Sequence, residues 1–380
     1  MKLITDVRSW AGMMAMFLFA CALGSCAPVR NVSGRNQNSP SVTIAAVGDI
    51  NGYNITADTQ DPLGDVKKLL SGDDIFIFNA ESVFSNWCLK SCRSFPKQST
   101  FLSSPSLLNY IPTGNLTVAS LANNHTFDCG NEGLSETIAA LQNRQIVPLG
   151  AGLNSEEACR PLAVRLNGLR LAMLSYLVTD IDKFYADVEK SGTASLQYCN
   201  GYAQISKIRE QDDFVIVILH SHLPYARGYE WVEKPHPKII TVVQSLLDAG
   251  ADLIIASGPH VPQAIMIKDE RVALLSLGNF IFDPDYKMPD KAHNSLLAKM
   301  TITMDSFKLC LIPIKLDIGG KPTLPSPQEA LSILGDIEKL SNELGTTLKI
   351  SGGVGCLEMA KKIRLNKQNF DEHDFHPQSD

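Results

Sequence analysis

Residues 116–130 read LTVASLANNHTFDCG, and this stretch contains the pattern that decides the fold. Leu116–Ala122 is an apolar run of strand length. It ends in polar residues: Asn123, Asn124 and His125. Apolar residues at helical spacing follow: Leu134, Ile138 and Leu141. A buried strand, a polar strand end and an amphipathic helix in succession are typical of α/β folds.

The same pattern recurs along the chain. Further apolar runs have strand length: Val42–Val47, Ile75–Phe78, Phe214–Leu219 and Leu253–Ala256. Residues 62–70 and 239–247 carry apolar side chains at helical spacing, so we expect helices between the strands. Strands that are hydrophobic on both faces imply a sheet that is covered on both sides.

Antiparallel pairs are predicted as well. Asn167-Gly168 lies between two apolar runs and is a strong signal for a two-residue hairpin turn. The runs 299–304 and 309–316 flank Asp305-Ser306 and indicate a second hairpin. We therefore expect a mixed α/β fold with antiparallel additions late in the chain.

The composition excludes two classes of protein. The 380 residues are 44% apolar and 19% charged, as in a packed globular chain and unlike a disordered one. Lys and Arg total 34 against 40 Asp and Glu, a formal net charge of −6. Because there is no basic surplus to neutralise phosphates, we expect no nucleic-acid partner. The length allows one large domain with appendages, or two domains.

The N-terminus has the pattern of a secretory signal. Lys2 and Arg8 precede the uncharged run Trp10–Leu23, which is short for a transmembrane helix. The run closes with Leu23-Gly24-Ser25-Cys26, which is similar to a bacterial lipoprotein signal whose cysteine is lipidated. A plain signal peptide and an uncleaved anchor are the alternatives. We expect an exported protein that is held on the bacterial membrane by a lipid on Cys26.

The sequence divides into four parts. Residues 1–26 are the expected lipoprotein signal peptide, and residues 27–41, rich in Asn, Ser and Gly, are a flexible tether. Residues 42–320 form the predicted α/β domain. Residues 321–380 are a C-terminal helix and tail.

Export makes disulfide bonds feasible. Cys88 and Cys92 are close enough in the sequence to pair within a loop, or they stay as two free thiols. Metal binding by this pair has no support from a second pair or from a nearby His. The remaining cysteines of the domain have no pairing that sequence alone can assign: Cys129, Cys159, Cys199, Cys310 and Cys356.

Polar or titratable residues stand at the ends of the predicted strands: Asp49, Asn79 with Glu81, Asn124 with His125, His220, and His260. In α/β sheets, ligands bind beyond the carboxyl ends of the strands, so these residues can meet although they are scattered along the chain. Taken singly, each has an ordinary explanation as a turn cap, an Asx-turn or a structural histidine. Their coincidence predicts a polar functional cleft, with a metal ion as one candidate occupant.

Six segments carry a family resemblance: Gly48-Asp49-Ile50, Asn79-Ala80-Glu81, residues 121–130, His220, Pro259–Gln263 and Ser276–Phe282. Together they resemble the CapA family of bacterial capsule and poly-gamma-glutamate biosynthesis proteins, which is related to the calcineurin-like metallophosphoesterases. The segments run in order between residues 42 and 318, and the helical pattern in 328–346 resembles the family's C-terminal helix. The resemblance implies an α/β fold with a two-sheet sandwich flanked by helices, which is metallophosphoesterase-like.

The resemblance also implies a metal site built from carboxylate, amide and imidazole ligands. The ligand positions are filled by Asp49, Glu81, Asn124, His220 and His260. His125 takes the position of the proton donor. Oxygen ligands together with imidazoles suit Mn, Zn or Fe, and a pair of such ions clamps an oxyanion and generates a hydroxide that attacks it.

The sequence departs from the phosphoesterase pattern at three points. Asn51 stands where the pattern has a His two residues after its first Asp. Ser257-Gly258-Pro259-His260 replaces Gly-His-x-His, so one imidazole is missing. His220–Pro224 replaces the family's His-Trp-Gly-x-Glu, which loses the acidic residue and makes His222 a candidate substitute ligand. These losses weaken the case for two tightly bound ions.

Three functions follow from this reading. The first is a surface-anchored capsule or poly-gamma-glutamate biosynthesis protein that handles an anionic polymer in the strand-end cleft, together with membrane-bound biosynthesis proteins. The second is a metal-dependent hydrolase of phosphoesters or of the polymer's amide bonds. The third is a non-catalytic polymer-binding lipoprotein with a degenerate metal site. Because the net charge is −6, handling a polyanion requires local positive charge, such as a metal ion.

Overall fold

The computed structural model describes residues 30–32, 40–52, 55, 61–91, 100–224, 232–284 and 288–363. The expected signal peptide, with its lipidated Cys26, lies outside the described residues. Among the residues described, no helix combines the length and the apolar composition needed to cross a membrane.

The larger of two main sheets has ten strands. Eight of them follow the order β20 (Lys349–Ser351), β21 (Val354–Ala360), β18 (Ser306–Leu316), β17 (Asn294–Thr303), β2 (Ser41–Ile50), β3 (Ile75–Asn79), β6 (Leu116–Ser120) and β7 (Ile146–Leu149). The remaining two lie off this order: β16 (Asn279–Ile281) pairs with β2, and β19 (Pro322–Thr323) pairs with β18. The pairs from β2 to β7 are parallel, whereas β17, β18, β20 and β21 pair antiparallel. The predicted hairpin of residues 299–316 is thus confirmed.

The second sheet has seven strands. Their order is β1 (Arg30–Asn31), β9 (Leu162–Leu166), β10 (Leu169–Thr179), β12 (Phe214–His222), β13 (Leu253–Ser257), β15 (Arg271–Leu274) and β14 (Ile265–Lys268). The β9–β10 hairpin turns at Asn167-Gly168, where both residues have positive φ, as the sequence predicts. Two residues of the expected tether form β1, which pairs parallel with β9 and is therefore part of the fold. This strand was not predicted because its two residues, Arg30 and Asn31, are polar and exposed and form no apolar pattern.

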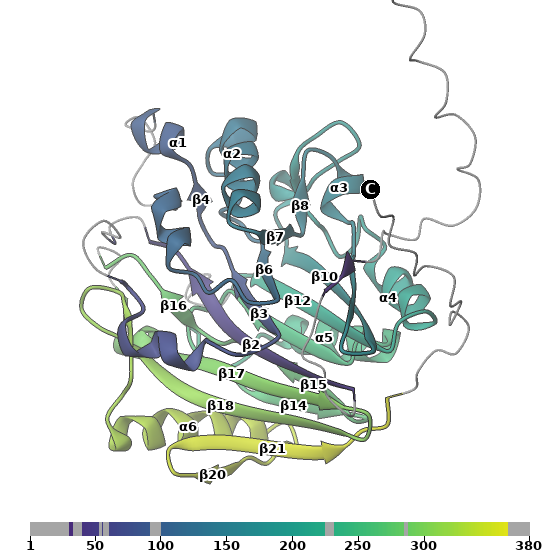
Figure 1. Ribbon diagram of the computed structural model, residues 1–380, viewed down its shortest axis with the longest axis vertical. Helices are drawn as coiled ribbons and strands as arrows, with labels where there is room; N and C mark the ends of the chain where they lie inside the picture. The colour runs from purple at the N-terminus through teal and green to yellow at the C-terminus, as the bar shows by residue number, and fades with distance from the viewer. Residues whose placement is uncertain are drawn as a thin grey trace, which may run out of the picture.

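The two sheets pack face to face, and helices cover their outer faces (Figure 1). Helices α4 (Gly201–Arg209) and α5 (Pro237–Ala249) pack on the second sheet. Helix α2 (Gly130–Asn143) packs on the larger one. Shorter elements connect these layers: η1 (Gly64–Leu69), β4 (Val83–Phe84), α1 (Asn86–Ser91), β5 (Leu102–Ser103), η3 (Pro105–Asn109), β8 (Ala151–Gly152), α3 (Ser155–Ala158), η4 (Asp182–Phe184), β11 (Gly192–Thr193) and η5 (Asp290–His293). The expected α/β sandwich flanked by helices is confirmed.

The C-terminal region joins the larger sheet. Helix α6 (Pro327–Asn342) begins with a capping box between Ser326 and Glu329, and it ends before the predicted limit at residue 346. The chain then forms β20 and β21, which the sequence reading assigned to a tail. Gly352 and Gly353 have positive φ in the turn between them.

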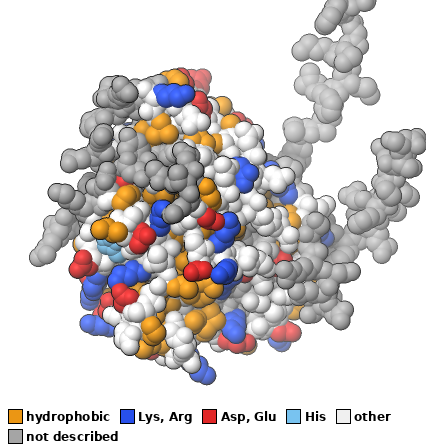
Figure 2. Space-filling model, turned by 60° about the vertical axis from the view of Figure 1, so that its left-hand side comes forward, with side chains coloured by type: hydrophobic (Ala, Val, Ile, Leu, Met, Phe, Trp, Pro, Cys, Tyr) orange, Lys and Arg blue, Asp and Glu red, His pale blue; other side chains and the backbone are white. Residues whose placement is uncertain are grey.

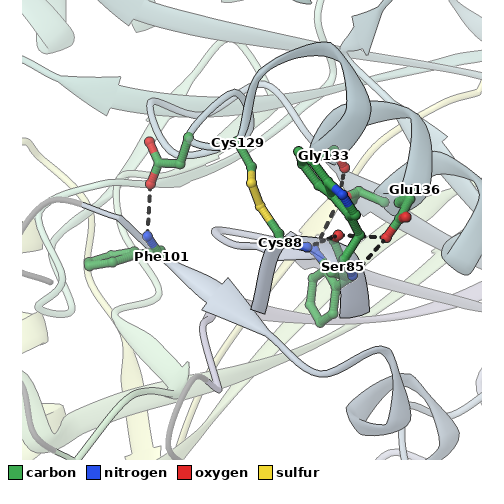
Figure 3. Close-up of a disulfide and its surroundings, with 10 residues drawn as sticks. Ser85, Cys88, Phe101, Cys129, Gly133 and Glu136 are labelled. Carbon is green, nitrogen blue, oxygen red and sulfur yellow. Dashed lines mark hydrogen bonds between the residues drawn. A yellow bond between two sulfur atoms is a disulfide. The ribbon is translucent and has the colours of Figure 1, made fainter. Parts of the chain in front are cut away.

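Three disulfide bonds stabilise the described part of the chain. The local pairing considered for Cys88 and Cys92 is wrong, because Cys88 of α1 is bonded to Cys129, the residue before α2 (Figure 3). The other bonds join Cys159 to Cys199 and Cys310 to Cys356. The last pair lies at opposed positions of β18 and β21. Pairings between distant residues depend on the tertiary fold, and sequence spacing does not reveal them.

Candidate metal centre

The five predicted ligand residues lie together where strands of both sheets end. They are Asp49 in β2, Glu81 after β3, Asn124 after β6, His220 in β12 and His260 after β13. All five are buried. One ligand atom from each of Asp49, Glu81 and His220 lies within 4.8 Å of the other two. The expectation that scattered strand ends converge is therefore correct for these residues.

His220 turns one ring nitrogen toward the oxygen-bearing side chains. Its Nε2 atom is 2.9 Å from Oδ1 of Asn124 and 3.5 Å from Oε1 of Glu81. Its Nδ1 atom is 2.9 Å from the hydroxyl of Ser257. Because Ser257 occupies the Nδ1 side, Nε2 is the atom that faces the cluster.

His260 faces a second group of oxygens. Its Nδ1 atom is 2.8 Å from Oδ1 of Asn279, 3.3 Å from Oδ2 of Asp49 and 3.7 Å from Oε2 of Glu81. The backbone of His260 has a φ of 59°, which residues other than Gly rarely adopt. Backbone strain of this kind clusters at functional sites, where surrounding structure holds it in place.

Asn279 is a member of the cluster that the sequence reading did not select. It begins β16, which pairs parallel with β2 and places Asn279 opposite Asp49. The available signal was its position in Ser276–Phe282, one of the segments that carries the family resemblance. Its neighbours in space come from distant parts of the chain, so local pattern could not identify its role.

A chain of side-chain amides supports Asp49. Asn79 donates from Nδ2 to Oδ1 of Asp49 at 2.8 Å. Asn123 in turn donates from Nδ2 to Oδ1 of Asn79 at 3.1 Å and to the carbonyl of Ala80 at 3.0 Å. Asn79 thus orients a carboxylate, and Oδ2 of Asp49 is the oxygen left near His260.

His125, the predicted proton donor, is paired with Asp128. The Nδ1 atom of His125 is 2.7 Å from Oδ2 of Asp128, which also accepts the backbone N–H of Phe101 at 2.8 Å. The rings of Phe101 and His125 are stacked, with centroids 3.7 Å apart. These contacts fix the orientation of the imidazole.

The protonation states of Asp49 and His220 suit metal binding. Burial alone would raise the pKa of Asp49, but the hydrogen bond from His260 and its charge hold that pKa below its usual value. Burial lowers the pKa of His220 to about 3. An ionised carboxylate and a neutral imidazole are the forms that ligate metals.

The spacing of the donor atoms also fits a divalent cation. Ligands about 2.1 Å from one ion and at right angles to each other lie about 3 Å apart. The distances from His220 Nε2 to Asn124 and Glu81, 2.9 and 3.5 Å, are close to this value. So are those from His260 Nδ1 to Asn279 and Asp49, 2.8 and 3.3 Å. The buried Asp/Glu/His group can hold a metal ion.

The three sequence departures have different structural outcomes. Asn51 is buried, and its side-chain amide has no hydrogen-bond partner within the described part of the chain. At Gly258, with a φ of 117°, an added Cβ would lie 2.0 Å from the carbonyl oxygen of Ser221, so no imidazole fits there. His222 lies against Thr179 and Phe184, 3.5 Å from the Thr179 hydroxyl.

Comparison with known proteins adds a family match and three individual similarities. A family model described as "Bacterial capsule synthesis protein PGA_cap" matches residues 25–284. The chain is 32% identical over 169 residues to the capsule biosynthesis protein CapA of Bacillus anthracis, covering 44% of this chain and 40% of that protein. It is 29% identical over 170 residues to the PGA biosynthesis protein CapA of Bacillus subtilis (strain 168), covering 44% and 43%. The chain thus spans less than half the length of these two relatives. The solved structure of NAD nucleotidase (NadN) from Haemophilus influenzae aligns with 80% of this chain and 63% of its own, at 11% identity and a TM-score of 0.40.

Proposed function

The chain belongs to the family of bacterial capsule synthesis proteins, and we propose that it takes part in the biosynthesis of a capsule polymer of the poly-gamma-glutamate class. The similarity to two Bacillus proteins named for capsule and PGA biosynthesis supports this proposal. A polymer of this class carries many carboxylates, so a site that handles it must attract negative charge.

The observation that carries the proposal is the buried cluster at the strand ends. Asp49 and Glu81 are both fully buried there, and two carboxylates alone would repel an anionic polymer. A bound divalent cation would supply positive charge to polymer oxygens in this strand-end cleft. Acidic and basic side chains are interspersed on the face drawn in Figure 2, and the whole chain has a net charge of −6. The cation therefore provides the attraction that the overall charge does not.

His125 favours a second candidate function, a metal-dependent hydrolase of phosphoesters or of the polymer's amide bonds. Asp128 accepts a hydrogen bond from Nδ1 of His125, which leaves Nε2 to exchange a proton with a bound group. An imidazole oriented in this way gives up a proton to a leaving group at low reorganisation cost. A site that binds the polymer without cleaving it would not depend on this proton.

Location is part of the proposal. We propose that the protein is exported and anchored through a lipid on Cys26, where it works with membrane-bound biosynthesis proteins. A Cys26→Ser variant should leave the membrane fraction and appear in the soluble fraction of exported protein. A variant that remains in the membrane fraction would contradict the lipid anchor.

The test of the function is complementation of a strain that lacks the gene. The wild-type gene should restore polymer on the cell surface, and Asp49→Ala should not. Asp65→Ala, in η1, is the matched control, because this exposed carboxylate lies outside the cluster and should restore the polymer fully. Unchanged polymer in the deletion strain would refute the proposal. The hydrolase is supported if His125→Ala also fails to complement and the purified wild-type protein cleaves a phosphoester or the polymer in the presence of Mn²⁺. Full complementation by His125→Ala favours polymer binding without catalysis.

A further inference from the structure

We propose that Asn279 is a metal ligand: its amide oxygen completes a second cation subsite with Asp49, Glu81 and His260, beside the subsite of His220, Asn124 and Glu81. This inference rests on the proposed cation of the preceding section. It adds a ligand and a second ion, and it assigns the class of metal. The oxygen-rich ligand set selects Mn²⁺ over Zn²⁺.

The position of Glu81 divides the cluster into two halves. Its Oε1 atom is 3.5 Å from Nε2 of His220, and its Oε2 atom is 3.7 Å from Nδ1 of His260. Each carboxylate oxygen therefore faces a different imidazole. A carboxylate placed in this way could ligate one cation through each oxygen.

The amide of Asn279 is oriented with its oxygen toward His260. On the other side, its Nδ2 atom donates to the carbonyl of Ala292 at 3.3 Å and to Sδ of Met288 at 3.4 Å. Because the nitrogen has these partners, Oδ1 is the atom 2.8 Å from Nδ1 of His260. Asn279 is fully buried, and its strand is paired with β2, so this orientation is held by the backbone.

A simple hydrogen bond from His260 to Asn279 does not account for the whole arrangement. One N–H can point well at only one acceptor. Around Nδ1 of His260, however, three oxygens lie at 2.8, 3.3 and 3.7 Å, from Asn279, Asp49 and Glu81. These three distances from one imidazole nitrogen are compatible with ligands that surround a common cation. The left-handed backbone of His260 aims its ring at this point.

Asn279 also supplies a ligand in place of the imidazoles that the sequence has lost. The backbone at Gly258 excludes any side chain, because a Cβ there would lie 2.0 Å from the carbonyl oxygen of Ser221. The second subsite then has three oxygens and one nitrogen. Carboxylate and carbonyl oxygens suit Mn²⁺ and Mg²⁺, whereas Zn²⁺ favours sites rich in imidazole or thiolate.

The test measures metal binding by the purified full chain after chelation, and it needs no activity assay. Titration with MnCl₂ followed by calorimetry and elemental analysis should give two Mn²⁺ per wild-type chain. Electron paramagnetic resonance should show magnetic coupling between them. Asn279→Ala should retain one ion, lose the coupled signal and bind the second ion at least about tenfold more weakly. Asn279→Asp keeps an oxygen at this position and should restore the second ion, which separates loss of a ligand from loss of the fold.

Each outcome bears on a different claim. Binding of two Mn²⁺ by Asn279→Ala with wild-type affinity would overturn the role of Asn279 as a ligand. Tighter binding of Zn²⁺ than of Mn²⁺ at the second subsite would overturn the assignment of the metal class. If the wild-type chain binds one ion and Asn279→Ala binds it equally well, only this inference fails and the single-cation function stands. If the wild-type chain binds no divalent cation, the proposed function fails as well.

Discussion

The Cys88–Cys129 disulfide ties stability to the orientation of His125, and its removal should affect both. Cys129, which is bonded to Cys88 (Figure 3), directly follows Asp128. The carboxylate of Asp128 holds His125 and the backbone of Phe101. The perturbation is the double variant Cys88→Ala/Cys129→Ala. We expect it to unfold at lower temperature and to loosen the contact between Asp128 and His125.

The magnitude of the stability loss follows from the sequence separation of the two cysteines. A bond between residues 41 positions apart restricts the unfolded chain, and in the chain-entropy model its removal costs about 4 kcal/mol at 25 °C. A matched control exists in Cys310–Cys356, which joins residues 46 positions apart on β18 and β21. The same model again gives about 4 kcal/mol. The two double variants should therefore lose similar stability.

The assay combines calorimetry with NMR of the imidazole ring of His125. Both double variants should melt about 6 °C below the wild type. Only Cys88→Ala/Cys129→Ala should shift the ring resonances of His125, because only that bond adjoins Asp128. An equal shift in the Cys310→Ala/Cys356→Ala variant, or no shift in either, would refute the positioning role of the first disulfide.

Three further predictions concern the metal cluster. Adding Mn²⁺ at about one hundred times its dissociation constant should stabilise the chelated protein by about 2.7 kcal/mol in calorimetry for each ion bound, and Asp49→Ala, which removes a ligand of the second subsite, should reduce this gain; an unchanged melting temperature would contradict cation binding. Gly258→Ala should destabilise the fold and weaken Mn²⁺ binding, because its Cβ would lie 2.0 Å from the carbonyl of Ser221, and wild-type melting would contradict the close approach. In the chelated protein, the stability should fall as the pH drops from about 6.5 toward 3, because His220 has a pKa of about 3 when folded and the unfolded chain takes up the proton first. The loss of unfolding free energy from His220 alone approaches about 1.4 kcal/mol per pH unit. If a His220→Gln variant loses stability with pH as steeply as the wild type, His220 is not the source of the loss.

Local pattern was sufficient to predict those parts of the molecule that depend on nearest neighbours in sequence. The apolar runs Ile75–Phe78 and Leu116–Ala122 correspond to strands β3 and β6, the second of which ends two residues earlier than predicted, and the helical spacing after His125 is helix α2. The hairpin at Asn167-Gly168 was readable because the left-handed turn requires those residue types. Convergence of the strand ends was predictable from the general rule for α/β sheets.

The parts that were missed depend on contacts between distant residues. Asn279 reaches the cluster only because β16 pairs with β2, and Cys88 finds Cys129 only after α1 and α2 come together. Likewise, β20 and β21 are stabilised by pairing with β18 more than by any pattern of their own. Such features become visible when the backbone fold is known, because register and packing decide them.

With the proposed lipid on Cys26, the short strand β1 would limit the distance between the domain and the membrane. Arg30 is already paired with Val164 of β9, and a lipid on Cys26 would precede it by four residues. Four extended residues reach at most about 14 Å. The domain would therefore lie close to the membrane, with the β1–β9 edge of the second sheet toward the bilayer surface. A polymer emerging from the membrane would then meet the protein at close range and in one preferred orientation.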